Sequence, residues 1–145
     1  MFKKLIIALF LATSIWAQTS TNFSGDGTAD SPFLIQNADN LALLATLVNA
    51  NTGTYPSAHY RLTANICLAH IDNWTPIGTN TNRFEGVFDG DGHTISNLRI
   101  TSGGNRGLFG YIGLNGTVRN VALENVGINT SGNTVAVSLV VYWAE

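Results

Sequence analysis

The chain has 145 residues, of which 45% are hydrophobic and 11% are charged. This length fits one domain, and the charged fraction is under half of the roughly 25% of an average soluble domain. A disordered chain combines low hydrophobicity with high net charge, so the composition argues against disorder of the chain as a whole. Both lysines, Lys3 and Lys4, stand at the N-terminus, which leaves five arginines against nine acidic residues. We therefore expect no nucleic-acid partner.

The N-terminus predicts export. Lys3 and Lys4 precede an apolar run from Leu5 to Leu11 and a small residue at Ala17, which is the order of regions in a signal peptide. We place cleavage after Ala17, so residues 1–17 are a signal peptide and the remainder is secreted or held at the cell surface. The apolar run is shorter than the roughly 20 residues that span a bilayer, which argues against an uncleaved membrane anchor. No second apolar run of spanning length follows, so we expect no membrane association after cleavage.

The next elements are a turn-rich segment, a strand, a helix and a second strand. Residues 18–32 are polar and rich in turn-forming residues, and we expect a flexible segment there. Phe33–Ile35 is predicted to be a short strand. Residues 38–49 have apolar residues at helical spacing, and Asn37 can cap that helix. Alternation of apolar and polar residues from Tyr60 to Leu68 predicts one strand with a single buried face. The apolar residues of the predicted helix are Leu41, Leu44, Ala45 and Val48.

A six-residue pattern, apolar-x-Asn-apolar-x-apolar, occurs at 95–100, 118–123 and 123–128, and its first two copies lie 23 residues apart. A spacing of this size is typical of solenoid coils. The apolar residues cannot share one face of a straight strand, so we expect the chain to bend at each asparagine, which tolerates left-handed backbone angles. In stacked coils these side chains can also form an amide ladder. We assign structural roles to Asn97, Asn120 and Asn125.

Together these features predict an all-β fold, a right-handed parallel β-helix (solenoid) with an N-terminal capping α-helix. Residues 33–73 would form the cap and the first strands, and residues 74–145 would form a few coils. The helix would cover the apolar end and strand edges of the first coil. Residues 135–142 are apolar, β-prone and uncharged, and no C-terminal cap is evident. We expect a second copy or further coils of a longer chain to stack through this segment.

Three segments in order resemble the bacterial proteins that carry the GLUG motif. They are residues 74–78, 84–98 and 107–111, and the stretches 25–35 and 60–66 resemble the sequence that usually precedes the motif. The resemblance implies a secreted or surface, adhesin-like repeat protein without an established activity of the repeat itself. Such repeats also stand beside the catalytic domain of some immunoglobulin A-cleaving metallopeptidases.

The end of the chain departs from this family. A second motif copy normally follows, and residues 138–142 align with residues 107–111 but have neither glycine. We assign structural roles to Gly107 and Gly110, and we expect Gly110 to supply a positive φ that Val141 cannot adopt. A solenoid usually needs about three repeats. The chain is therefore predicted to be a truncated member, which is a fragment, a decayed gene product or a unit that assembles with another chain.

Asp89, Asp91 and His93 are the candidate catalytic residues. Parallel solenoids host polysaccharide-cleaving enzymes, in which carboxylates act as acid and base. However, Asp89 and Asp91 belong to an Asp-Gly-Asp-Gly sequence, which is a turn composition and a structural element in the resembling family. We favour the structural interpretation and expect no enzymatic activity.

Metal binding is not expected either. Cys67, His70 and Asp72 are ligand types, but a zinc site draws on a second pair of ligands. The sequence at 89–93 departs from the calcium-loop pattern at its third ligand position. We expect no metal and no cofactor. Cys67 is the sole cysteine, so an internal disulfide is excluded, and strand parity turns its thiol away from the core, where it either pairs with another chain or stays free.

Three residues are candidates for binding a partner. Trp74 lies in a polar loop and is expected to be exposed, and Arg83 and Arg106 end the loops 79–83 and 101–106. These features predict a non-enzymatic structural or adhesion-type module that displays loops to a glycan or a surface protein. Two alternatives stay open, a relative of β-helical polysaccharide lyases or glycoside hydrolases, and a truncated product without independent function.

Overall fold

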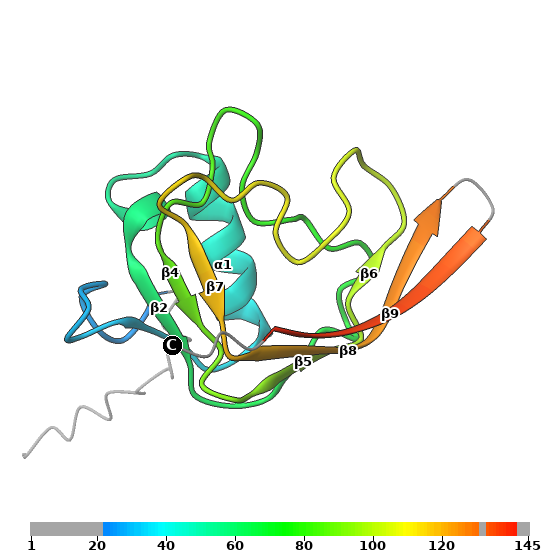
Figure 1. Ribbon diagram of the computed structural model, residues 1–145, viewed down its shortest axis with the longest axis horizontal. Coiled ribbons are helices and arrows are strands. Elements are labelled where there is room, and N and C mark those ends of the chain that lie inside the picture. Colours follow the sequence, from blue (N-terminus) through cyan, green and yellow to red (C-terminus); the bar gives the residue numbers. More distant parts are fainter. Residues whose placement is uncertain (1–21, 131–132, 142–145) are drawn as a thin grey trace, which may run out of the picture.

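The structure is a computed structural model that describes residues 22–130 and 133–141. The predicted signal peptide at 1–17 lies outside the described residues. The chain is mostly β, with parallel strands in both sheets and one α-helix (Figure 1). No helix among the described residues has the length and apolar character needed to cross a membrane.

Two sheets and the helix make up the fold. The first sheet has the strand order β1-β2-β4-β7, and the second has the order β3-β5-β8-β6 with β9 also paired to β8. The helix α1 (Ala38–Asn49) and the short 3-10 helix η1 (Tyr55–Ser57) lie between β1 and β2 in the chain. The strands are β1 (Phe33–Ile35), β2 (His59–Leu62), β3 (Ile66–Cys67), β4 (Val87–Asp89), β5 (Thr94–Ser96), β6 (Arg99–Ile100), β7 (Thr117–Arg119), β8 (Val121–Thr130) and β9 (Asn133–Val141).

The chain repeats one path, and each passage lies beside the previous one. We call each passage a coil, because it adds a strand to the first sheet and then a strand to the second. In the first sheet Tyr60 pairs with Phe88 and Phe88 pairs with Val118, all in parallel. In the second sheet Ile95 pairs with Leu123. Ile66 likewise pairs with Ile95, so these registers set neighbouring coils 28 to 30 residues apart.

The 23-residue spacing predicted for the coils is therefore wrong. The pattern copy at 95–100 lies beside the copy at 123–128, because Ile95 pairs with Leu123 and Ile100 with Ile128. The copy at 118–123 instead spans the corner between β7 and β8. One six-residue pattern thus builds two different corners of a coil, and the distance between two unlike corners is not the length of a coil.

The helix α1 forms over the predicted range. The side-chain Oδ1 of Asn37 accepts a hydrogen bond from the backbone N–H of Asn40 at 2.9 Å, which satisfies one of the unpaired donors of the first turn. The apolar face packs inward, as the spacing predicted. Its buried residues include Leu41, Leu44, Ala45 and Val48.

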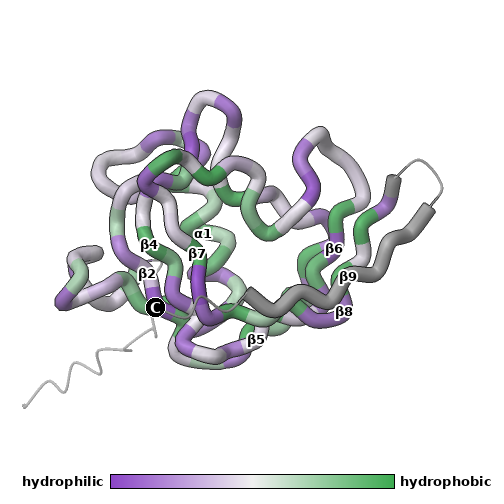
Figure 2. The backbone as a smooth tube through the Cα atoms, viewed as in Figure 1, coloured by the Kyte–Doolittle hydropathy of each residue, from purple (hydrophilic) through white to green (hydrophobic). Residues whose placement is uncertain are grey.

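A single core joins α1 to both sheets. Phe84 and Phe88 are fully buried, and the ring centroid of Phe109 lies 5.1 Å from that of Phe84 and 5.4 Å from that of Phe88. Hydrophilic stretches lie in the protruding loops and also alternate with apolar stretches along the strands (Figure 2). Residues 22–32, which were expected to be flexible, pack through Phe23, whose ring lies 5.2 Å from that of Phe33.

The single strand predicted from Tyr60 to Leu68 is two strands in two sheets. The strand β2 ends at Leu62, and β3 begins at Ile66 in the other sheet. Asn65 holds the corner between them, because its Oδ1 accepts from the backbone N–H of Thr94 at 3.0 Å. The apolar alternation survives because the corner spans an odd number of residues, so Leu62, Ile66 and Leu68 all face the core.

The C-terminal strand contains the segment that was predicted to stack. The strand β9 pairs antiparallel with β8, from Val121 opposite Val141 to Thr130 opposite Asn133. Residues 135–141 therefore cover one edge of β8, whereas the outer edge of β9 has no partner strand among the described residues, so stacking through this segment stays a prediction. Residue 142 lies outside the described residues. Pairing with the strand next in sequence closes a very short loop, which costs little entropy.

Candidate functional site

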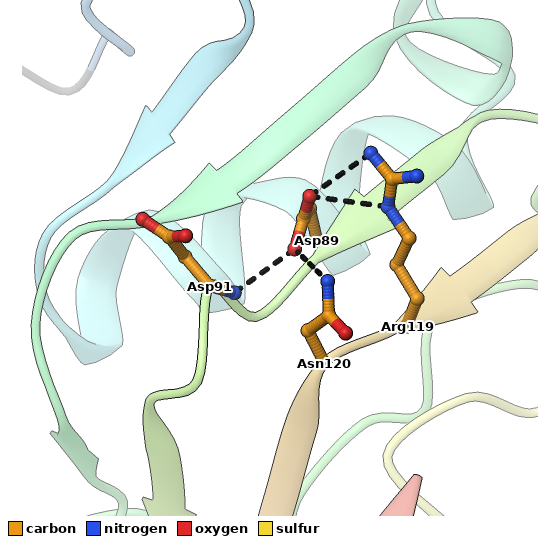
Figure 3. A network of polar contacts seen from close by, with 4 residues as sticks. All are labelled: Asp89, Asp91, Arg119 and Asn120. Atoms are coloured by element: carbon orange, nitrogen blue, oxygen red, sulfur yellow. Dashed lines mark hydrogen bonds and ion pairs between the residues drawn. The ribbon is translucent and has the colours of Figure 1, made fainter. Parts of the chain in front are cut away.

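The candidate catalytic residue Asp89 lies at the corner between β4 and β5 and is 8% exposed. Its Oδ2 accepts from Arg119 Nε at 3.1 Å and lies 3.0 Å from Arg119 Nη2. Its Oδ1 accepts from Asn120 Nδ2 at 3.1 Å and from the backbone N–H of Asp91 at 3.0 Å (Figure 3). Arg119 and Asn120 belong to the next coil, so this carboxylate ties two coils together.

The environment of Asp89 keeps it ionised. Burial by itself would raise the pKa of Asp89, but the hydrogen bonds from Asp91 and Asn120 and the charge of Arg119 outweigh burial and lower the pKa below its ordinary value. A general acid needs a raised pKa, and a general base needs a lone pair that faces the substrate. Four donors surround this carboxylate, so the geometry suits a structural anchor.

The other two candidate catalytic residues, Asp91 and His93, point in different directions. Asp91 is exposed, has a φ of 49°, and its carboxylate points away from Asp89 (Figure 3). The Nδ1 of His93 lies 3.3 Å from Oδ1 of Asn65, on the preceding coil. The carboxylates of Asp89 and Asp91 and the imidazole of His93 therefore do not converge on a common point, as a shared acid–base site would require.

The three predicted asparagine bends are present. Asn97, Asn120 and Asn125 have φ values of 60°, 53° and 50°, in the left-handed region. The amide ladder is present at one corner, where Nδ2 of Asn125 donates to Oδ1 of Asn97 and Nδ2 of Asn97 donates to Sγ of Cys67 at 3.1 Å. Asn120 does not join it, because its amide binds Asp89.

Cys67 is exposed and unpaired, with its thiol outside the core as strand parity predicted. A hydrogen bond from the backbone of Ala69 and then one from the side chain of Asn97 lower the pKa of the Cys67 thiol, since both stabilise the thiolate. Within residues 22–130 and 133–141, no three His, Cys, Asp or Glu residues gather closely enough to hold a metal ion.

The exposure predicted for Trp74 is wrong. The residue is 2% exposed, and its Nε1 donates to the carbonyl of Leu108 at 3.1 Å. Burial of the large ring is favourable because its one polar group has a partner. Trp74 packs inside the coils, where it cannot act as a platform for a sugar ring.

Arg83 and Arg106 are exposed, as expected of binding residues. Arg83 Nε donates to the carbonyl of Asn80 at 3.3 Å, and Arg106 Nη1 donates to the carbonyl of Asn129. Each of these bonds uses one of the five N–H donors of a guanidinium group. Both groups keep donors that can meet a partner.

The glycines predicted to be structural act through close packing. Gly110 does not have the expected positive φ. A Cβ there would lie 2.6 Å from the carbonyl oxygen of Gly78, whereas a Cβ on Gly107 would lie 3.0 Å from that of Phe109. The backbone at Gly110 approaches the neighbouring coil, since its N–H donates to the carbonyl of Ile77 at 2.8 Å.

Two important residues escaped sequence reasoning. Arg119 could have been paired with Asp89 only after the 30-residue register between them was known. Asn49, at the end of α1, holds the backbone around Pro76 and Gly78 in a later segment, because its side chain donates to the carbonyl of Pro76 at 3.0 Å and accepts from the N–H of Gly78 at 2.8 Å. Nothing in the helical periodicity distinguishes Asn49 from a solvated polar residue.

Comparison with known proteins gives three similarities. No protein-family model matches the chain, so the resemblance to GLUG-motif proteins stays a prediction. The chain is 39% identical over 123 residues to "Putative Gly-rich membrane protein" of Evansella cellulosilytica, which covers 80% of this chain and 14% of that protein. It is 39% identical over 131 residues to Halomucin of Haloquadratum walsbyi, which covers 81% of this chain and 1% of that protein.

A solved structure also matches. It is the crystal structure of a "putative immunoglobulin A1 protease" from Bacteroides ovatus, with a TM-score of 0.59 and 30% identity over 70% of this chain and 29% of that chain. The chain thus spans a small part of each of these relatives.

Proposed function

We propose that this chain is a non-enzymatic structural module, a short right-handed parallel β-solenoid that is exported and displays its loops to a glycan or a protein at the cell surface. The observation that carries this proposal is the use of the repeated polar residues. Asp89 and Asn120 bond to each other between coils, and Asn125 bonds to Asn97 in the same way. Side chains used in this way build a scaffold.

The loops are the parts of the scaffold that face solvent. Loop 79–83 is anchored at its base, because Nδ2 of Asn82 donates to the carbonyl of Asn49 at 2.7 Å and the N–H of Asn82 donates to Thr79 Oγ1 at 2.9 Å. Arg83 stands exposed beside this anchor. A charged group on a fixed loop loses less conformational entropy on binding than one on a free chain.

The relatives support a modular role. One of them is named as a membrane protein, and the similarity covers a small part of each. The name of the Bacteroides ovatus protein refers to a protease, but this chain has no His-Glu-x-x-His sequence, the motif that holds zinc in many metallopeptidases. We therefore propose display for this chain, at the surface of the cell that exports it.

A binding screen tests the proposal. The purified chain is applied to an array of host and plant glycans and to extracted surface proteins, together with an Arg83→Ala/Arg106→Ala double variant. We expect at least a tenfold loss of binding in the double variant. Arg61→Ala, which removes an exposed arginine from a strand, is the matched control and should bind like the wild type.

A turnover assay distinguishes the enzymatic alternative. We expect no cleavage of polysaccharides by the wild-type chain. Cleavage that Asp91→Asn abolishes would overturn the proposal, and Asp91 is the suitable residue because it is exposed and its side chain points away from the coil anchor. Asp89→Asn is unsuitable because it also weakens the contact between coils.

A further inference from the structure

In the part of the chain that the structure describes, one edge of the first sheet has no partner strand. The strand β7 is last in the order β1-β2-β4-β7, and among the described residues no strand pairs with its second edge. Thr117 N–H donates to the carbonyl of Gly86, and the carbonyl of Arg119 accepts from the N–H of Gly90. Alternate residues of a strand bond to opposite sides, so the N–H and C=O of Val118 point to the open edge. Free groups of this kind are templates for another strand.

Exposed apolar side chains precede this edge in the same coil. Tyr111 is 36% exposed, Ile112 45% and Leu114 100%. Ile112 forms a parallel bridge to Phe84 on the preceding coil, just as β7 pairs with β4. Grouped exposed apolar residues mark interaction sites more often than single ones do. We call Tyr111, Ile112, Leu114, Val118 and Arg119 the open coil face.

Charge at one register position indicates what should lie next to this face. Arg61 pairs with Asp89, and Asp89 pairs with Arg119, so the sign alternates from coil to coil. The Arg119 side chain is 40% exposed and meets Asp89 through Nε and Nη2, which leaves further N–H donors of the guanidinium group. An acidic residue on the far side of Arg119 would continue the alternation.

A second copy of the chain does not offer this chemistry. The other edge strand of the first sheet, β1, contains Phe33, Leu34 and Ile35 and no acidic residue. Its outer side is also engaged, because the N–H of Leu34 donates to the carbonyl of Ser24 at 2.8 Å. The two edges of the first sheet are therefore not complementary, and head-to-tail stacking of copies through this sheet is disfavoured.

We propose that the open coil face binds an extended segment of a partner protein, which adds to β7 as a parallel strand with an apolar residue opposite Val118 and an acidic residue opposite Arg119. Backbone hydrogen bonds to Val118 supply affinity, and the side-chain positions supply specificity, as in other cases of strand addition. One segment of the chain itself has the sequence pattern expected of this partner. Residues 87–89, Val-Phe-Asp, have the same pattern and already occupy the inner side of β7. This face is distinct from the loops of the proposed display function.

Peptide binding tests the proposal. A fluorescently labelled peptide with the sequence of residues 85–91, Glu-Gly-Val-Phe-Asp-Gly-Asp, is titrated against the full chain, and its anisotropy is measured. We expect saturable binding, and at least a tenfold loss when the Asp that corresponds to Asp89 is replaced by Lys. Absence of saturable binding, or equal binding of the Lys peptide, would overturn the proposal.

Variants of the chain locate the peptide. Leu114→Ser changes a fully exposed side chain, so we expect an unchanged Tm and at least a fivefold loss of peptide affinity. Val118→Pro removes the outward N–H while the bonds of Thr117 and Arg119 to the preceding coil remain, so this variant should also lose peptide affinity. If Val118→Pro does not fold, the peptide affinity of Leu114→Ser decides between the outcomes. Arg83→Ala should leave peptide binding unchanged even where it abolishes glycan binding, so the two proposals fail independently. If Leu114→Ser binds the peptide with wild-type affinity, the proposal of strand addition at the open coil face is wrong.

Discussion

The two asparagine corners of the coil are built from one sequence pattern but held by different forces. At the corner of Asn120, the amide binds the nearly buried carboxylate of Asp89, which also meets Arg119. At the corner of Asn125, the amide binds the neutral side chain of Asn97, and this contact is exposed. Both corners have the same left-handed backbone. The sequence pattern therefore determines the bend, and the contacts with the neighbouring coil determine how much the bend is stabilised.

The difference has an energetic basis. A hydrogen bond to a charged group contributes about 1.5–3 kcal/mol, whereas one between neutral groups contributes about 1 kcal/mol. The first corner also lacks room, because a Cβ on Gly90 would lie 2.3 Å from the carbonyl oxygen of Asn120. We therefore expect the corner of Asp89 to be sensitive to mutation and the corner of Asn125 to be tolerant.

The largest effect should come from Gly90→Ala. The added methyl group would meet the backbone of the next coil, which cannot move without breaking the corner, so we expect a loss of about 3 kcal/mol in the free energy of unfolding. Denaturant titration followed by circular dichroism measures it. Gly127→Ala is the matched control near the other corner, where a Cβ would meet nothing within 4 Å. Equal losses in the two variants would contradict the contrast between the corners.

Asp89→Ala should cause the second largest loss of stability. It leaves Arg119 and Asn120 without their acceptor, and we expect a loss of about 2–3 kcal/mol in the free energy of unfolding. Asp91→Asn keeps a residue that tolerates a positive φ and removes only an exposed charge, so its stability should match that of the wild type. A smaller loss in Asp89→Ala than in Asp91→Asn would remove the anchor role of Asp89.

The asparagines themselves should rank in the same order. Alanine in the left-handed region costs about 1–2 kcal/mol, and each variant also loses one hydrogen bond, to a carboxylate in Asn120→Ala and to a neutral amide in Asn125→Ala. At the lower ends of these ranges we expect a loss of about 2.5 kcal/mol for Asn120→Ala and about 2 kcal/mol for Asn125→Ala. Asn125→Gly separates the two contributions, because glycine has no strain there and only the ladder bond is lost. Thermal unfolding of the three variants gives the ranking, and a reversed order would break the comparison.

Acid should weaken only the charged corner. The pKa of Asp89 is lower in the folded chain than its ordinary value, so the unfolded chain binds the proton more readily. The contribution of Asp89 to stability is present above about pH 4 and is lost as the pH falls through its folded pKa. Asp89→Asn should therefore flatten the acid limb of the stability curve. In Asn125→Gly that limb should keep its shape, and a flattening there would contradict the assignment.

The smallest effect should come from Cys67→Ala. The thiol is exposed, and as an acceptor from Asn97 it is weak, so we expect a change in the free energy of unfolding of under about 0.5 kcal/mol. Chemical denaturation under reducing conditions checks this. A loss above 1 kcal/mol would mean that the contact between Cys67 and Asn97 stabilises the ladder as much as the contact between Asn97 and Asn125.

Much of the local structure could be read from the sequence. The spacing of apolar residues placed α1 at 38–49, and Asn37 caps it. The asparagine pattern located three left-handed bends. These features depend on contacts within a few residues, which a sequence displays directly. The exposure of Trp74 could not be read in this way, because the groups that bury it lie in the neighbouring coil.

The sequence identified the residues of the candidate site but not the groups that they contact. Sequence reasoning selected Asp89, Asp91 and His93 for their chemistry and preferred a structural role for them. Only the structure pairs Asp89 with Arg119 and turns Asp91 away from the anchor. Residues 135–141 pair with β8, and among the described residues both β7 and β9 have one edge without a partner strand.

The sequence by itself determined where the chain bends, which faces of its strands are apolar and where its helix lies, because these properties follow from residue type and local spacing. The tertiary structure alone decided the register. A shift from the 23-residue repeat to coils of 28 to 30 residues changes every contact between coils. That choice depends on the fit of the whole core and on the pairing of charges far apart in the chain, and no local pattern records either.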